Sequence, residues 1–275
     1  MKPALGIIAG SGGLPGKLID AALADKRDVF VVGVKGEANP ALLERVSHDW
    51  VGLGSLGALF KMLKQNRCEQ VVFAGHVHRP SLRNLSLDWY GLKLFPRILK
   101  AAKQGDGALL SLLVTQIEQE GFQVVGAEQV SRDLLAPEGA LGDLAPNPED
   151  LEDIEKGARV VAKLGGLDIG QAAVVRGGLV LGVEAAEGTD NLIERCGAIP
   201  GDRGGVLVKI SKPGQERRVD LPTIGVTTVE KAAAAGLNGI AVEAGGALIL
   251  DQEQVLTRAE AEGVFVYGIS NTILK

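Results

Sequence analysis

The chain has 275 residues, of which 46% are hydrophobic and 23% charged, and its formal net charge is -5. This length allows one large or two medium globular domains, and the acidic balance argues against a broad nucleic-acid surface. Two cysteines far apart in the sequence make neither a disulfide framework nor a CxxC zinc motif. Without a bilayer-length apolar run or a signal-peptide pattern, the sequence predicts a soluble cytoplasmic protein.

The first part of the chain alternates apolar runs with helical stretches. Continuous apolar runs of this kind form strands that are covered on both faces, and their alternation with helices is typical of a parallel, Rossmann-like sheet. Ligands of such a sheet bind beyond the carboxyl ends of its strands. The expected strands are 5–9, 29–34, 51–54 and 70–75, and the expected helices include 17–24 and 57–64.

A glycine-rich loop, Gly10 to Gly16, follows the first expected strand. Glycines let backbone N–H groups approach an anion at the start of the next helix, so we expect Gly10, Ser11 and Gly12 to contact a nucleotide phosphate or ribose. The alternative is a tight turn that only connects strand to helix. As a dinucleotide fingerprint the loop is imperfect, because Pro15 stands at the third glycine position.

A second loop, Gly75 to Arg79, follows the strand at 70–75. Its histidines, His76 and His78, could ligate a metal ion. The further sequence blocks that calcineurin-like phosphoesterases use for a two-metal site are missing, however. We therefore expect Gly75 and Arg79 to contact substrate and leave the two histidines outside the catalytic set.

Residues 88–103 mix large apolar side chains with four cations. Such a segment can lie at a membrane surface or line a groove for acyl chains. It can equally be an amphipathic helix packed on the protein's own core. The sequence leaves these alternatives open.

A stretch rich in Pro, Gly and acidic residues at 134–148 predicts an interdomain linker. The expected fold class is α/β with two domains. The first, 1–133, has a Rossmann-like parallel sheet with helices. The second, 149–275, has a mixed sheet.

A predicted hairpin that ends at Val183 is followed by three acids, Glu184, Glu187 and Asp190. Acids at a strand-to-helix junction can hold a hard cation through oxygen ligands. The alternative is that Thr189 or Asp190 caps the next helix and the glutamates face water.

Lys209 and Lys212 end a later strand-like run, before Pro213. On a regular strand they would point to opposite faces, and they converge only if the proline marks a bend. Two lysines close to Asp220 could hold a diphosphate, because cations stabilise the charge of transferring phosphoryl groups.

Asp220 stands at a predicted strand end. Val219 ends an apolar-polar alternation, and Pro222 presets a turn. Residues Thr227–Glu230 form a capping-box pattern that predicts the start of a helix. A carboxylate in this setting suits a divalent cation with an anionic group nearby, although Asp220 could also only cap the turn.

Several sequence blocks recur in this order in one family, and on them the chain resembles the UDP-2,3-diacylglucosamine pyrophosphatases of lipid A synthesis in some Gram-negative bacteria. This family is unrelated to the calcineurin-like phosphoesterases. The likeness covers essentially the whole chain, and the Asp-Leu-Pro-Thr-Ile-Gly and Glu-Gly-Thr-Asp blocks are specific together. The blocks are Leu5–Gly10, Ala74-Gly75 with Arg79-Pro80, Leu167–Gln171, Val183–Asp190 and Val219–Gly225.

The resemblance implies two domains joined by a flexible linker, a Mg²⁺ requirement, and hydrolysis of UDP-2,3-diacylglucosamine to UMP and 2,3-diacylglucosamine 1-phosphate. It implies that water attacks the sugar-side phosphorus and that the family's essential aspartate is Asp220. We hypothesise that Asp220, Glu187 and Asp190 hold the metal, and that Lys209 and Lys212 stabilise the phosphoryl oxygens. The expected substrate contacts are Gly10, Ser11, Gly12, Gly75, Arg79, Gln171, Gly188, Thr189 and Thr223.

Further expectations are a homodimer, no nucleic-acid partner, and peripheral contact with the cytoplasmic face of the inner membrane. Two other functions remain open at this point. One is a nucleotide-sugar or NAD-dependent oxidoreductase, supported only by the first glycine loop. The other is a non-catalytic carrier of a nucleotide or lipid.

Overall fold

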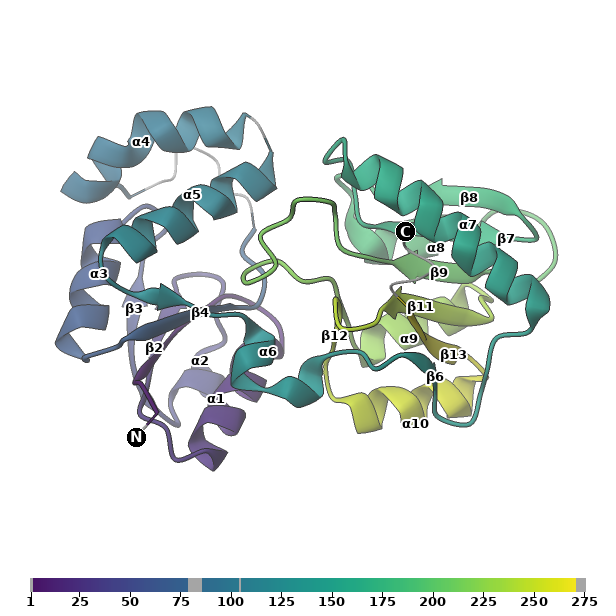
Figure 1. The fold of residues 1–275 in the computed structure, drawn as a ribbon, viewed down its shortest axis with the longest axis horizontal. Helices are drawn as coiled ribbons and strands as arrows, with labels where there is room; N and C mark the ends of the chain where they lie inside the picture. Colours follow the sequence, from purple (N-terminus) through teal and green to yellow (C-terminus); the bar gives the residue numbers. More distant parts are fainter. Residues whose placement is uncertain (1, 79–85, 104, 271–275) are drawn as a thin grey trace. The chain divides into compact units, whose positions relative to one another are not determined.

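The computed structural model describes residues 2–78, 86–103 and 105–270 (Figure 1). The chain forms two compact units. The first contains the residues up to Arg132 together with Arg218–Asp220. The second contains Asp133–Arg217 and the residues from Leu221 onwards. Three residues from late in the sequence therefore belong to the N-terminal unit.

The first unit is built on a five-stranded sheet. Its strands are β1 (Leu5–Ala9), β2 (Val29–Val34), β3 (Ser47–Val51), β4 (Gln70–Ala74) and β5 (Gln123–Val124). They are parallel and lie in the order β3-β2-β1-β4-β5. The strand order reverses between β1 and β4, so this unit has the switch point of a Rossmann-like fold.

Helices cover both faces of this sheet (Figure 1). The helices are α1 (Leu14–Ala24), α2 (Pro40–Leu43), α3 (Leu56–Gln65), α4 (Trp89–Ala102), α5 (Asp106–Gln119) and α6 (Ala127–Val130). One face packs against α3, α4 and α5 in a cluster that contains Val32, Leu63 and Val71. Helix α1 covers β1, β2 and β4 on the other face. The apolar runs of the sequence are thus buried on both sides, as expected for parallel strands.

Two of the elements expected in this unit are displaced from the sequence prediction by more than one residue. The third strand is Ser47–Val51 rather than 51–54, because an edge strand exposes every second residue and is not a continuous apolar run. Helix α1 begins at Leu14 rather than at Lys17. Pro15 fits the first turn, where a missing N–H costs nothing.

The second unit is built on a mixed six-stranded sheet in the order β6-β13-β11-β9-β7-β8. Its central strands β9, β11 and β13 are parallel, whereas β6 and β7 run antiparallel to their neighbours. A separate two-stranded ladder pairs β10 with β12. The strands are β6 (Gly139–Leu141), β7 (Ala172–Arg176), β8 (Leu179–Val183), β9 (Val206–Lys209), β10 (Thr223–Ile224), β11 (Gly239–Glu243), β12 (Leu248–Ile249) and β13 (Phe265–Ile269).

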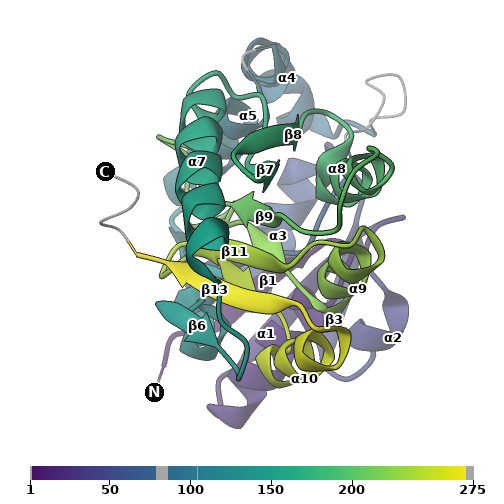
Figure 2. The ribbon, with the colours of Figure 1, turned by 90° about the vertical axis from the view of Figure 1, so that its right-hand side faces the viewer.

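Helix α7 (Pro148–Gly165) crosses one face of this sheet, and α8 (Gly188–Gly197), α9 (Val226–Ala234) and α10 (Gln252–Glu262) cover the other (Figure 2). Alternate residues of β9 lie in the two hydrophobic clusters on opposite faces of the sheet. Val206 and Val208 pack with α7, while Leu207 packs with the other three helices. The fold class expected from the sequence is therefore confirmed.

Residues 134–148, which the sequence predicts as a linker, contain ordered structure of the second unit. Strand β6 pairs with β13, and the Ala136 N–H donates to the Ala247 carbonyl. In the part of the chain that the structure describes, no helix is long and apolar enough to cross a membrane.

Candidate functional site

The loops after β1 and β4 meet at the switch point of the first unit. Ser11 and His76 form an antiparallel bridge with two backbone hydrogen bonds, of 2.7 and 3.0 Å. Gly10 and Gly75 permit this approach, because a Cβ on Gly10 would lie 2.3 Å from the His76 oxygen and one on Gly75 would lie 2.2 Å from the Ser11 oxygen. These predicted substrate contacts therefore have a structural role in joining the loops.

The part of the glycine loop that faces open space lies further along. The N–H groups of Gly10 and Ser11 already donate to Ala74 and His76. At Gly12 and Gly13, an added Cβ would meet no described heavy atom within 4 Å. The backbone of Gly12 can thus approach an anion without steric hindrance. The N–H groups of Gly10 and Ser11, in contrast, already donate to carbonyls of the protein.

The two histidines of the second loop lie with their rings 5.0 Å apart and nearly perpendicular. His78 Nδ1 is 2.9 Å from a Glu37 carboxylate oxygen, and Glu37 also accepts the His78 N–H. Glu37 thereby joins the loop after β2 to the loop after β4. Arg79, another predicted substrate contact, lies outside the described residues.

The edge of the second sheet at the carboxyl ends of β9 and β11 gathers polar side chains. Lys209 ends β9 and is only 7% exposed, and its Nζ donates to the Thr223 carbonyl at 3.0 Å. Ala172, the first residue of β7, pairs with Lys209. Lys209 and Thr223, predicted from the sequence as a catalytic residue and a substrate contact, are thus brought together.

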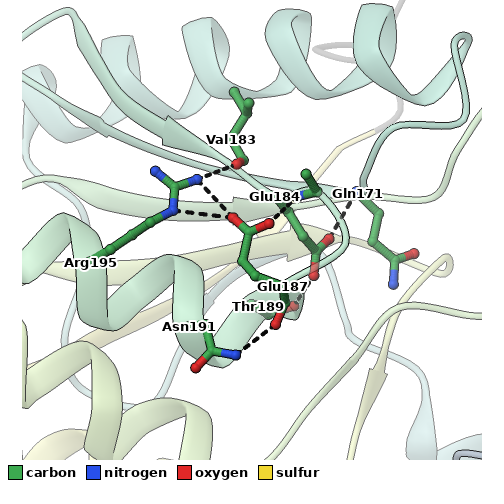
Figure 3. Close-up of polar contacts among 8 residues, drawn as sticks. Gln171, Val183, Glu184, Glu187, Thr189, Asn191 and Arg195 are labelled. Carbon is green, nitrogen blue, oxygen red and sulfur yellow. Dashed lines mark hydrogen bonds and ion pairs between the residues drawn. The ribbon is translucent and has the colours of Figure 1, made fainter. Parts of the chain in front are cut away.

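At the same edge, the buried carboxylate of Glu184 accepts hydrogen bonds from two other residues (Figure 3). One carboxylate oxygen accepts the Gln171 backbone N–H at 2.9 Å, and the other accepts the Thr189 hydroxyl at 2.6 Å. Gln171 and Thr189, both predicted substrate contacts, therefore donate to the same carboxylate. The side-chain Oε1 of Gln171 is buried and has no hydrogen-bond partner among the described residues. An orphaned acceptor of this kind suits a hydroxyl or N–H donor rather than a phosphate.

The two further candidate metal ligands, Glu187 and Asp190, are each paired with a cation of the protein. Glu187 accepts from Arg195 at 2.9 and 3.1 Å (Figure 3). Its own backbone N–H and Arg195 lower the pKa of Glu187. Asp190 lies 3.6 Å from Lys231, whose pKa is raised chiefly by its hydrogen bond with Glu194. Gly188 between them has a φ of +79°, which favours glycine at the start of α8.

Lys212 and Lys209 lie against different groups of the protein. Its Nζ lies 2.8 Å from Asp168, in the loop before β7. The two lysines that the sequence places on one phosphoryl group thus make different contacts, because one lies at the strand end and the other in the loop that leaves it.

The loop that leads to Asp220 is held by a carboxylate that the sequence interpretation did not select. Glu243, at the end of β11, is 6% exposed and accepts the Ser211 N–H and the Arg217 guanidinium, both at 2.9 Å. A carboxylate that closes a buried apolar strand was the available signal, since buried carboxylates require partners. Its two partners lie far away in sequence and are found only in the fold.

Asp220 is half-buried, which is neither a dry core nor an open surface. Its segment belongs to the first unit, where Arg218 forms an ion pair with Glu118 of α5 at 2.6 Å and Val219 packs against the core cluster. The Asp220 carboxylate therefore lies on a segment that an ion pair and an apolar contact hold in place.

The helix after Asp220 begins earlier than predicted. Helix α9 starts at Val226 with Gly225 as its N-cap, rather than at Thr227. The side chain of Thr228 accepts the Gly225 N–H at 3.3 Å, so the helix is capped two residues before the predicted Thr227–Glu230 box.

In the described part of the chain, no group of three or more His, Cys, Asp or Glu side chains is arranged to hold a metal ion. Mg²⁺ commonly keeps several waters and is bound through one or two carboxylates together with substrate phosphates. Asp220 can supply one such carboxylate. The described residues therefore fit a Mg²⁺ ion that takes a carboxylate ligand from the protein and further oxygen ligands from a bound phosphate. They do not fit a metal centre in which the protein supplies every ligand.

Comparison with known proteins matches both halves of the chain. The family described as the LpxI N-terminal domain matches residues 4–134, and the LpxI C-terminal domain matches residues 137–267. A protein from Caulobacter vibrioides, described as UDP-2,3-diacylglucosamine pyrophosphatase LpxI, is 45% identical over 272 residues. The alignment covers 96% of this chain and 97% of that protein.

Proposed function

Because the chain belongs to the LpxI family, we propose that it hydrolyses the diphosphate of UDP-2,3-diacylglucosamine to UMP and 2,3-diacylglucosamine 1-phosphate. The observation that supports this most directly is the 45% identity, over 96% of this chain, to a protein named as a pyrophosphatase of this substrate. The structure adds a carboxylate, Asp220, on a segment whose neighbours fix its position.

We assign the catalytic carboxylate to Asp220. An ionised carboxylate at this position can hold Mg²⁺ on the diphosphate, and bound Mg²⁺ would neutralise phosphoryl charge and make the phosphorus a better electrophile. Glu187 and Asp190 already have cation partners from the protein, so in this proposal they order the start of α8. The remaining positions around the metal would belong to water and to substrate oxygens.

The other polar groups then receive separate roles. The buried Lys209 supplies a preorganised positive charge for the phosphoryl oxygens, in a setting where a cation is screened less than in water. The orphaned acceptor of Gln171 would take a hydroxyl or N–H group of the substrate. Gly12, at the open part of the glycine loop, would contact the nucleotide through its backbone.

The proposal sets the reaction in the cytoplasm, at the membrane that contains the substrate. A substrate with two acyl chains is amphipathic, and an enzyme that acts on it must reach it in a lipid phase. A homodimer remains an expectation of the family resemblance.

The test is incubation of the purified full-length protein with UDP-2,3-diacylglucosamine, with and without Mg²⁺, followed by measurement of UMP. We expect Mg²⁺-dependent UMP release. Asp220→Ala should reduce kcat by about a thousandfold or more, because several kcal/mol of charge stabilisation are lost. Asp202→Ala removes an exposed carboxylate and should retain activity.

Two results would contradict the proposal in different ways. Substrate recovered unchanged after long incubation with Mg²⁺ would favour a carrier over an enzyme. Normal turnover by Asp220→Ala would leave the activity standing and remove the assignment of its carboxylate.

A further inference from the structure

Helix α4 is firmly docked on the first unit through one of its sides. Leu94 and Ala101 are 4% and 9% exposed. The Tyr90 ring lies edge-on to Phe60 of α3, with centroids 5.0 Å apart. The amphipathic pattern of residues 88–103 therefore does pack on the protein's own core, which was one of the alternatives the sequence left open.

The opposite side of α4 nevertheless exposes large apolar groups. Trp89 is 83% exposed and Leu92 is 53% exposed. At about 100° of rotation per residue, the exposed side chains of this helix share one outward arc. An almost fully exposed tryptophan beside an exposed leucine is informative, whereas a single exposed leucine would not be. The residues of this outer face are Trp89, Leu92, Lys93, Pro96, Arg97, Lys100 and Lys103.

The outer face is also positively charged, in a chain of net charge -5. It carries four cations, Lys93, Arg97, Lys100 and Lys103, and no acidic residue lies between positions 89 and 103. Within the described residues, none of these four cations takes part in an ion pair. The face therefore combines apolar surface with uncompensated positive charge.

We propose that the outer face of α4 docks on the surface of an anionic phospholipid bilayer. Tryptophan and leucine can enter the boundary between headgroups and acyl chains, while lysine and arginine side chains extend to the anionic headgroups. A second copy of the chain fits less well, because a symmetric contact would oppose two faces of the same charge. The proposal uses none of the residues assigned to hydrolysis, so it stands or falls by lipid binding alone.

The first experiment is flotation of the full-length protein with vesicles of phosphatidylcholine, with and without phosphatidylglycerol. Binding is expected only with the anionic lipid and should weaken as salt is added. The variant Lys93→Gln/Arg97→Gln/Lys100→Gln should bind on the order of a hundredfold more weakly, at roughly fivefold for each cation removed. The control, Lys26→Gln/Arg159→Gln/Lys163→Gln, removes the same charge from exposed positions elsewhere.

The second experiment follows Trp89 directly. Because the chain has two tryptophans, Trp50→Phe makes Trp89 the single indole reporter. Its emission should shift to the blue, and brominated phosphatidylglycerol should quench it, only in the presence of anionic vesicles. Trp89→Ser changes an exposed side chain, so circular dichroism should be unchanged while vesicle binding falls.

Three results would overturn the proposal. One is the absence of binding to anionic vesicles, and another is an equal loss of binding in both triple variants. The third is a lipid-free dimer, seen by sedimentation velocity, that Trp89→Ser converts to monomer. That result would assign the face to contact between copies of the chain.

Discussion

Lys209 combines burial with a positive charge at the end of a central parallel strand. Lysine is rarely buried to this degree unless it has partners, and the Nζ of Lys209 donates to the Thr223 carbonyl. The side chain of Lys212 differs in kind, because it is more exposed and paired with Asp168. The two lysines therefore provide a matched comparison of a buried lysine with a more exposed lysine that pairs with Asp168.

We expect Lys209→Met to lower kcat by about a hundredfold, which is the effect of removing one preorganised group that stabilises transition-state charge. Lys212→Met should lower it less than about threefold, since it breaks a partly exposed ion pair of small energetic worth. Steady-state UMP release measures both. Equal effects of the two substitutions would show that burial does not distinguish the lysines, and circular dichroism would report any loss of folding.

At the scale of elements, the segment Arg218–Asp220 is held by an ion pair of Arg218 and by an apolar contact of Val219, among other contacts. The Arg218–Glu118 pair is partly exposed, with 35% and 41% of the two side chains accessible, so its contribution to stability is at most about 1 kcal/mol. Its value lies in position, because small displacements of a catalytic group can cost far more in rate than in stability. Glu118 is therefore a positioning residue for Asp220 in the proposed reaction.

Glu118→Arg should reduce kcat about tenfold and change KM little, because it opposes two positive charges next to the catalytic segment. The charge swap Glu118→Arg/Arg218→Glu should restore most of the lost rate, and thermal stability should vary by no more than about 1 kcal/mol. Asp20→Arg, which disrupts the comparably exposed pair with Arg45, is the control. A swap as slow as the single variant, or a control equally slow, would remove the positioning role.

The elements differ in how far the sequence could predict them. Strand β1 is a continuous apolar run, and such runs predict buried parallel strands well. Strand β6 lies in a stretch rich in Pro and Gly, and it is a strand because β13 offers a partner, which local sequence cannot show. Likewise, the role of Glu243 can be recognised only in the fold, where Ser211 and Arg217 donate hydrogen bonds to its carboxylate. The sequence points to Asp220 only through the family resemblance, because its spacing alone also allows a simple turn cap.

At the scale of the whole molecule, the chain contains separate hydrophobic cores. Leu63 lies in the cluster of the first unit and Leu207 in a cluster of the second, and both are fully buried. Family matches at residues 4–134 and 137–267 follow nearly the same division. The exception is the segment Arg218–Asp220, which lies late in the sequence but belongs to the first unit.

We expect calorimetry of the full-length protein to show two unfolding transitions, because each unit has a core of its own and domains of this kind unfold cooperatively on their own. Leu63→Ala and Leu207→Ala should each remove about 2–5 kcal/mol by leaving a cavity, and each should lower the midpoint of a different transition. Val219→Ala removes a smaller side chain from the contact of Arg218–Asp220 with the first unit. It should shift only the transition that Leu63→Ala shifts, and by a smaller amount. A single transition that moves equally in all three variants would mean that the late segment joins the two cores into one cooperative structure.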